Sequence, residues 1–269
     1  MVWDIDPILF RIPFLNLAVR YYGVIFALNF ILGLLLFRWQ IKRSGAPAEE
    51  ALDMVWPGFL GLLIGARLGH VFFYNFNLFL KDPLWLFKVW EGGLTSHGAA
   101  IGLLAAVFWY ARRHRRPFWD VCDRLCFSGA LGAALIRLGN FFNSEIVGRV
   151  TDAAWAVKFP RYDFPLPADL APFRYPSQLV EFGAGMLILG ILLLTDRLAG
   201  GEKRPRGLIS SAFFTLYFLA RFLIEFIKER QGPQDDLLLS RGQILSVPPL
   251  ILGLILLAVI ICHRPRHCG

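Results

Sequence analysis

The chain has 269 residues, of which 56% are apolar and only 18% carry a charge. This composition excludes an ordinary soluble domain, in which about a quarter of the residues are charged, and it indicates a membrane protein. The formal net charge is +8. We attribute it mainly to the basic loops that orient membrane proteins, and not to a nucleic-acid-binding surface.

Apolar runs long enough to cross the ~30 Å hydrocarbon core recur along the whole chain. They predict an all-α polytopic membrane protein, a bundle of about seven transmembrane helices. The runs lie near residues 20–38, 53–75, 94–111, 121–142, 176–195, 207–228 and 244–262. No change in composition marks a second domain, so residues 1–269 are expected to form a single transmembrane domain.

Basic residues are concentrated in one set of short connections and in the C-terminal tail. They are Arg38, Lys42, Arg43, Arg112, Arg113, Arg115, Arg116, Arg197, Lys203, Arg204, Arg206, Arg264 and Arg266. Because cytoplasmic loops are enriched in Lys and Arg, we expect the N-terminus outside and the C-terminus in the cytoplasm. No basic leader or cleavage site precedes the first helix, which is therefore expected to remain as an anchor. The longest loop, at about 145–176, then lies outside and has the length of an arm or lid over a site.

The stretch from Arg137 to Gly148 ends an otherwise featureless apolar run. It places the amides of Asn140 and Asn143 and the carboxylate of Glu145 close to Arg137 in the sequence. An arginine near the middle of a membrane helix costs about 2.5–3.5 kcal/mol on insertion scales. We therefore expect Arg137 to hold an anion, and lipid phosphate is the first candidate.

Two further predicted helices carry polar residues towards the same outer side. His97 stands among glycines at the start of the third run, where a packing role and a functional role are equally plausible. Tyr217, Arg221 and Glu225 follow one another at a spacing of four, which places them on one face of the sixth helix. Arg221 and Glu225 could simply neutralise each other. However, two intramembrane arginines on different helices favour a shared anion pocket.

Two other features have mainly structural interpretations. Arg67 lies between Gly65 and Gly69, where a tight helix contact is expected. Hydrogen bonding of Arg67 to backbone carbonyls is favoured over a role as a third pocket charge. Cys122 and Cys126 are four residues apart but have no accompanying cluster of His or acidic residues, so we expect packing and no metal site.

Taken together, these segments resemble the bacterial phosphatidylglycerol–prolipoprotein diacylglyceryl transferase family. The family signature is close to Gly-Arg-x-Gly-Asn-Phe-x-Asn-x-Glu-x-x-Gly, and residues 136–148 match every fixed position except the first, which is Ile136. Other similar segments are Arg20-Tyr-Tyr-Gly23, Gly65-Ala-Arg67-Leu-Gly69, Gly92-Gly-Leu-Thr-Ser-His97-Gly98, Tyr175-Pro-Ser-Gln-Leu-Val-Glu181 and Arg221-Phe-Leu-Ile-Glu225. Tyr175 stands where many members have histidine, so the chain departs from the family pattern at this position.

The resemblance implies that the diacylglyceryl group of phosphatidylglycerol moves to the lipobox cysteine of a preprolipoprotein signal peptide. The product is a thioether, glycerol phosphate leaves, and this is the first step of lipoprotein maturation. The resemblance also implies the bacterial inner membrane, an active site towards the outer leaflet, and no cofactor.

The roles that follow from the resemblance fall on the residues already singled out. His97 is the first candidate for the base that activates the thiol, and Glu145 is the second. Arg137 and Arg221 would bind the phosphate. The remaining expected substrate-site residues are Asn140, Asn143, Gly148, Tyr22, Tyr217 and Glu225, with Glu225 orienting Arg221 and the tyrosines lining the lipid pocket.

Two other functions involve similar membrane proteins. A CDP-alcohol phosphotransferase would need an Asp-rich metal-binding pattern that the sequence lacks. A transporter of lipid or an anionic solute, with the arginines as its transit site, predicts internal repeats. No convincing repeat relates residues 1–130 to 140–269, so the transporter is the alternative and not the main prediction.

Overall fold

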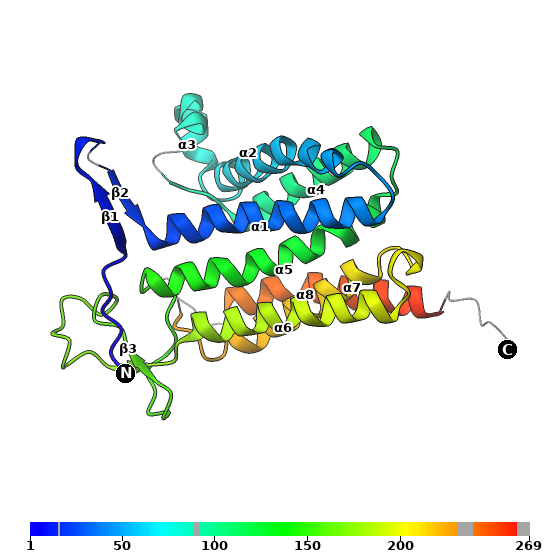
Figure 1. Cartoon of the computed structure of the whole chain (residues 1–269). Coiled ribbons are helices and arrows are strands. Elements are labelled where there is room, and N and C mark those ends of the chain that lie inside the picture. The colour runs from blue at the N-terminus through cyan, green and yellow to red at the C-terminus, as the bar shows by residue number, and fades with distance from the viewer. Residues whose placement is uncertain (16, 89–91, 231–238, 263–269) are drawn as a thin grey trace. The chain divides into compact units, whose positions relative to one another are not determined.

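The computed structural model describes residues 1–15, 17–88, 92–230 and 239–262. It divides the chain into two compact units, and each is described by itself: unit 1 (residues 1–35 and 125–269) and unit 2 (residues 36–124). The helices are α1 (Tyr21–Arg43), α2 (Val55–Tyr74), α3 (Phe76–Lys81), α4 (Ser96–Arg113), α5 (Phe118–Phe142), α6 (Ser177–Leu198), α7 (Leu208–Ile224) and α8 (Arg241–Cys262) (Figure 1). α1 and α5 contribute residues to both units.

The helices confirm the predicted class of polytopic membrane protein. Each of the seven apolar runs contains one helix, and α3 is an additional short one. Within the described ranges, five helices are long and apolar enough to cross a membrane: α1, α2 with its preceding turn, α5, α6 and α8. α7 is apolar but shorter, and α4 ends in two arginines. The count of seven spans and the orientation therefore remain predictions.

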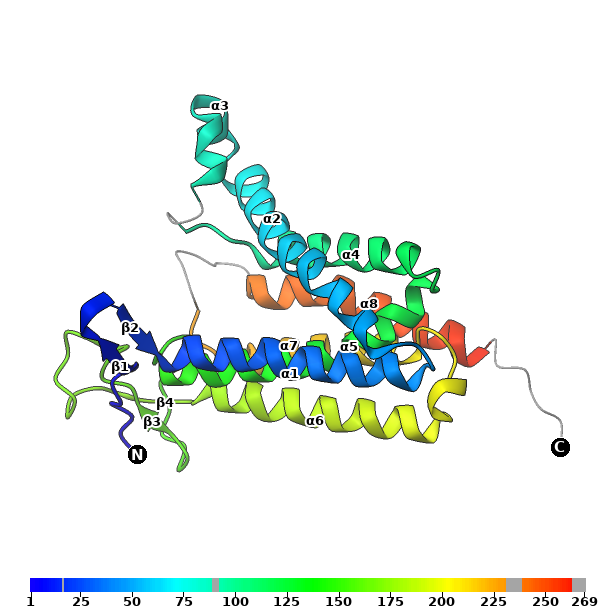
Figure 2. The ribbon, with the colours of Figure 1, turned by 45° about the horizontal axis from the view of Figure 1, so that its top comes forward.

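In unit 1, α7 packs against both α6 and α8 (Figure 1, Figure 2). Small residues allow these backbones to approach closely, as is usual for membrane helices. A side chain added at Gly185 of α6 would meet Ala134 of α5, and one added at Gly253 of α8 would meet Thr215 of α7. α5 is joined to α1 by the Ser128 hydroxyl, which donates to a carbonyl oxygen of α1 at 2.7 Å.

The segment between α5 and α6, predicted as an arm or lid, contains a two-stranded antiparallel pair, β3 (Val157–Lys158) and β4 (Phe173–Arg174). Its buried residues Val157 and Phe159 cluster with Phe141, at the end of α5, and Val147; Trp3, near the N-terminus, packs against this cluster. The Trp3 indole also donates to the Phe141 carbonyl at 3.0 Å. The segment is therefore anchored on the end of α5 by both apolar contacts and hydrogen bonds.

Arg174 ties this segment to the chain that follows α7. Its guanidinium binds Asp163 through Nε and Nη2, at 3.0 and 2.6 Å, and Glu229 through Nη1 at 3.2 Å. Hydrogen bonding to Asp163 raises the pKa of Arg174, so this cation keeps its charge. Arg174 thus holds three stretches of the chain together at one end of unit 1.

A β-hairpin precedes α1 and was not predicted from the sequence. It pairs β1 (Ile8–Ile12) with β2 (Leu17–Arg20) in antiparallel register. The apolar residues of this stretch resemble the lead-in to a membrane helix, which is why hydropathy alone does not distinguish them.

In unit 2, α2 and α4 form a very close glycine contact. Gly61 faces Gly102, and Gly65 and Gly69 face Gly98, so that an added Cβ at any of these positions would overlap backbone atoms. The Arg67 side chain donates from Nε to the Leu86 carbonyl at 2.9 Å and from Nη1 to that of Gly92 at 2.6 Å. The expected structural role of Arg67 is therefore confirmed.

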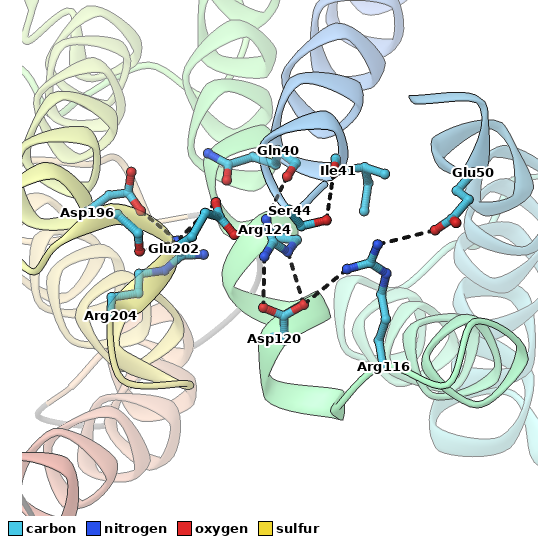
Figure 3. Close-up of polar contacts among 11 residues, drawn as sticks. Gln40, Ile41, Ser44, Glu50, Arg116, Asp120, Arg124, Asp196, Glu202 and Arg204 are labelled. Carbon is cyan, nitrogen blue, oxygen red and sulfur yellow. Dashed lines mark hydrogen bonds and ion pairs between the residues drawn. The ribbon is translucent and has the colours of Figure 1, made fainter. Parts of the chain in front are cut away.

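Unit 2 also contains a buried polar network at the C-terminal end of α1 and the start of α5 (Figure 3). Arg124 donates to the Gln40 carbonyl at 2.6 Å and to Asp120 at 3.0 Å. Asp120 is 3.6 Å from Arg116, which is 3.3 Å from Glu50. Each of these charges has an opposite neighbour, so the network needs no ligand to balance it.

Unit 1 has a separate ion pair in the connection between α6 and α7 (Figure 3). Arg204 lies 2.7 Å from Asp196, and both side chains are almost completely buried. This pair joins the last turn of α6, which contains Asp196, to the connection that follows it, which contains Arg204.

Candidate active site

The candidate site is built around Arg137, in the last two turns of α5. Its Nε lies 3.0 Å from Glu181 Oε2 on α6, and its Nη1 donates to Asn140 Oδ1 at 3.1 Å. Nη2 makes no hydrogen bond with a described residue. The arginine is therefore held from two sides while part of its guanidinium remains available to a ligand.

Glu181 links Arg137 to a second cation. Its Oε1 lies 3.4 Å from Lys228 Nζ, and Lys228 is in turn 3.6 Å from Glu225 Oε2. The Glu181 and Lys228 side chains are only 8% and 9% exposed. Neither was predicted as a site residue. A carboxylate within the apolar run of α6 was the available signal for Glu181, whereas Lys228 follows the last apolar turn and has no comparable signal.

Arg137 and Arg221 line one pocket between α5, α6 and α7, as expected for two arginines that share an anion site. Its lining residues are Ala133, Arg137, Glu181, Ala184, Gly185, Ile188, Tyr217, Ala220, Arg221 and Ile224. The cavity is about 20 Å³, which is room for about one water molecule. A phosphate group needs more space, so binding requires that a lining side chain move.

Arg221 is the side chain that is free to do so. Its guanidinium makes no hydrogen bond or ion pair with any residue in the described part of the chain. The expected pairing with Glu225 is wrong for this structure, since the Glu225 carboxylate is paired with Lys228. Glu225 still has helical backbone angles, and its N–H donates to the Arg221 carbonyl at 3.1 Å. The difference therefore lies in its side chain, which pairs with Lys228, three residues further on.

Glu145 is braced by both amides of the signature segment. Asn140 and Asn143 each donate from Nδ2 to the same oxygen, Glu145 Oε1, at 2.8 and 3.2 Å. Among the described residues, Oε2 accepts no hydrogen bond. This arrangement directs one carboxylate oxygen away from its braces, as a proton acceptor or a hydroxyl-binding group requires.

The two tyrosines both lie beside these groups. The Tyr22 ring packs against Gly139, which lies between Arg137 and Asn143 in the signature segment. Tyr217 lines the arginine pocket and stacks on Phe213 with ring centroids 5.5 Å apart. Both positions suit the expected lining of a lipid site.

Gly148 has a structural explanation that does not involve a ligand. Its N–H donates to the Tyr175 carbonyl at 2.9 Å, and an added Cβ would lie 2.5 Å from that oxygen and 2.8 Å from the Ile227 carbonyl. Only glycine fits where these three chain segments cross. Its expected place in the substrate site stays a prediction.

His97 belongs to unit 2, where it is the second residue of α4 and is exposed. It makes no hydrogen bond with a described residue, so the contacts give no support to a packing role.

Residues 7–259 match the protein-family model described as prolipoprotein diacylglyceryl transferase. The chain belongs to this family. Relatives named phosphatidylglycerol–prolipoprotein diacylglyceryl transferase include one from Vibrio cholerae, which is 42% identical over 94% of this chain and 91% of its own length. One from Vibrio campbellii is 41% identical (94% and 90% covered), and one from Aeromonas hydrophila is 40% identical (99% and 94% covered).

Family membership identifies the chain as a membrane-embedded transferase, and a transporter is not favoured. The signature segment that carried the resemblance, residues 136–148, is also the segment that holds Arg137, its two amides and Glu145. The segment that identifies the family is therefore also the segment that makes the polar contacts of the candidate site.

Proposed function

We propose that this enzyme transfers the sn-1,2-diacylglyceryl group of phosphatidylglycerol to the lipobox cysteine of a preprolipoprotein. The names of its relatives support both substrates. The structural observation that carries the proposal is the pocket that Arg137 and Arg221 share, with Arg221 lacking a partner among the described residues.

The charges around this pocket favour an anionic ligand. The charged residues that line it are two arginines, Arg137 and Arg221, and one carboxylate, Glu181. One positive charge is left uncompensated, which is costly for a group removed from water. A lipid phosphodiester carries a single negative charge and would balance it. A neutral or cationic headgroup would not.

The proposed reaction is a displacement at carbon. The cysteine sulfur forms a bond to the terminal carbon of the diacylglyceryl group, the bond from that carbon to the phosphate oxygen breaks, and glycerol phosphate leaves with the electron pair. Negative charge grows on the leaving phosphate. Two arginines in a dry pocket stabilise that charge strongly, and Arg137 is already fixed by Glu181 and Asn140 for this task.

The thiol must lose its proton, because only a few per cent of an ordinary cysteine is thiolate at neutral pH. His97 is the first candidate for the base, and it is exposed and without a hydrogen-bonding partner in the described chain. Glu145 is the second candidate, because its Oε2 is free while its Oε1 is braced. In either case Asn140, Asn143 and Glu145 would contact the glycerol headgroup, and Tyr22 and Tyr217 would contact the lipid.

We place the enzyme in the bacterial inner membrane with the site towards the outer leaflet. The distribution of Lys and Arg supports an outside N-terminus and a cytoplasmic C-terminus. In unit 1, Arg137 lies at the end of α5 that leads into the long segment 145–176, opposite the basic connection between α6 and α7. This location suits a cysteine that follows the apolar run of a signal peptide.

The deciding experiment is mass spectrometry of a lipobox peptide incubated with the purified protein and phosphatidylglycerol. We expect the peptide to gain one diacylglyceryl unit, and a peptide with serine in place of the cysteine to gain none. Phosphatidylcholine vesicles serve as the lipid control, because a zwitterionic headgroup does not supply the net charge that the pocket requires. An unmodified peptide in the presence of folded, lipid-bound protein would overturn the proposed reaction.

A further inference from the structure

The turn that carries Glu145 has an unusual backbone. Ser144 and Ile146, on either side of Glu145, both have positive φ angles, 53° and 57°. Residues other than glycine seldom adopt this left-handed conformation, and a β-branched residue such as isoleucine is a particular outlier there. Such backbone conformations persist only where the surrounding structure holds them.

Two side chains from the start of α6 hold this turn. Ser177 Oγ donates to the Ile146 carbonyl at 2.9 Å, and Gln178 Nε2 donates to the Glu145 carbonyl at 2.8 Å. Both donors are completely buried. Because only the NH₂ group of the amide can donate to a carbonyl, the orientation of the Gln178 side chain is determined.

These side chains are not used to cap their own helix. Serine near the start of a helix commonly accepts a hydrogen bond from a backbone N–H of the first turn. α6 instead begins after Pro176 without any side-chain cap. The hydrogen-bonding capacity of Ser177 and Gln178 is therefore directed to the Glu145 turn.

The result is a glutamate that is held through both its backbone and its side chain. Gln178 holds the main-chain carbonyl, while Asn140 and Asn143 hold Oε1. Oε2 is the remaining free oxygen, and its direction follows from these contacts. A rotation of the turn would move Oε2 even if both asparagine contacts survived.

We infer that Ser177 and Gln178 are positioning residues, which set the direction of Glu145 Oε2 towards the reacting lipid and peptide. They act through the backbone of the strained turn and contact no reacting atom themselves. This inference rests on the proposed transferase function.

The test uses the full-length protein and the lipobox-peptide assay, with kcat and KM for phosphatidylglycerol measured separately. Gln178→Met keeps the size of the side chain but removes the donor. We expect kcat to fall about 10- to 100-fold while KM changes less than about threefold, because a misplacement near 1 Å can cost a factor of that size. Ser211→Ala is the matched control, since Ser211 is equally buried but bonds only within its own helix, to Leu208.

A second substitution separates positioning from a general loss of structure. Glycine adopts a left-handed conformation without strain, so Ile146→Gly in the Gln178→Met background should recover several-fold of the lost kcat. A role limited to stability would change the unfolding temperature and leave kcat of the folded protein unaltered. If Gln178→Met does not fold, Ser177→Ala removes a single bond and is judged by the same readout.

The outcomes distinguish this inference from the proposed function. An inactive wild-type protein overturns the function, and the inference with it. An active wild type together with a folded Gln178→Met variant of normal kcat overturns the inference alone, and so does a double variant with no recovery.

Discussion

Replacing Glu181 by glutamine would remove the carboxylate partner of Arg137 and one of the two carboxylate partners of Lys228. The carboxylate lies 3.0 Å from Arg137 Nε and 3.4 Å from Lys228 Nζ, and its side chain is 8% exposed. With an effective dielectric constant of about 20, each attraction at these distances is about 5 kcal/mol. Desolvation offsets much of this, so we expect Glu181→Gln to lower the free energy of unfolding by about 3–5 kcal/mol.

The assay is thermal unfolding in mild detergent, where this loss corresponds to a fall on the order of 10 °C for a chain of this length. Adding Lys228→Met removes a cation that has lost one of its two carboxylate partners and should restore part of the loss, with a coupling energy of at least about 1 kcal/mol. Arg161→Met is the control, because it breaks an ion pair of the same 3.0 Å length to Asp4 whose side chains are 40% and 52% exposed. A Glu181→Gln protein that unfolds at the wild-type temperature would refute the reasoning.

Three further predictions concern the pocket, the glycine contact and the segment between α5 and α6. Arg221→Met should reduce transfer by about 10²–10³-fold without lowering the unfolding temperature, because it removes an unpaired cation; marked destabilisation would show that Arg221 is structural. Gly65→Leu should prevent close packing of α2 on α4, so that no folded protein is recovered from size-exclusion chromatography. Gly58→Ala should be tolerated, because Gly58 lies beside only a flexible Met side chain. Equal yields of the two variants would contradict close packing at Gly65. Arg174→Met breaks contacts to Asp163 and Glu229 and should expose the segment to limited proteolysis before the helices are cut; an unchanged cleavage pattern would count against this anchoring role.

The long helices were predictable because about 20 consecutive apolar residues are needed to cross the hydrocarbon core, and such a run can be recognised from the local sequence alone. The hairpin before α1 and the short α3 were not, since neither has a period or length that separates it from the flanking apolar residues. Arg137 and Arg221 were also predictable, because a charge within an apolar run is conspicuous and costly. Both arginines line the same pocket.

The partners of those charges were decided by tertiary structure. Sequence spacing allowed Arg221 and Glu225 to neutralise each other, yet the Glu225 carboxylate lies 3.6 Å from Lys228. Glu181 became the partner of Arg137 because close packing of Gly185 on Ala134 brings α6 against α5. The Arg137–Glu181 contact joins two different helices and is not encoded by a local pattern, whereas Glu225 and Lys228 are only three residues apart.

By itself, the sequence determined the membrane class, the helical segments and the family, because hydrophobic length and a dense signature of polar residues are both visible in a linear string. The three-dimensional fold decided which charge is left unpaired, which oxygen of Glu145 is free, and that Ser177 and Gln178 hold the Glu145 turn. The bonds from Asn140 and Asn143 to Glu145 are local, but they depend on the backbone conformation of the turn. The bonds from Ser177 and Gln178 join residues 31 and 33 positions apart, and only helix packing brings such residues within about 3 Å.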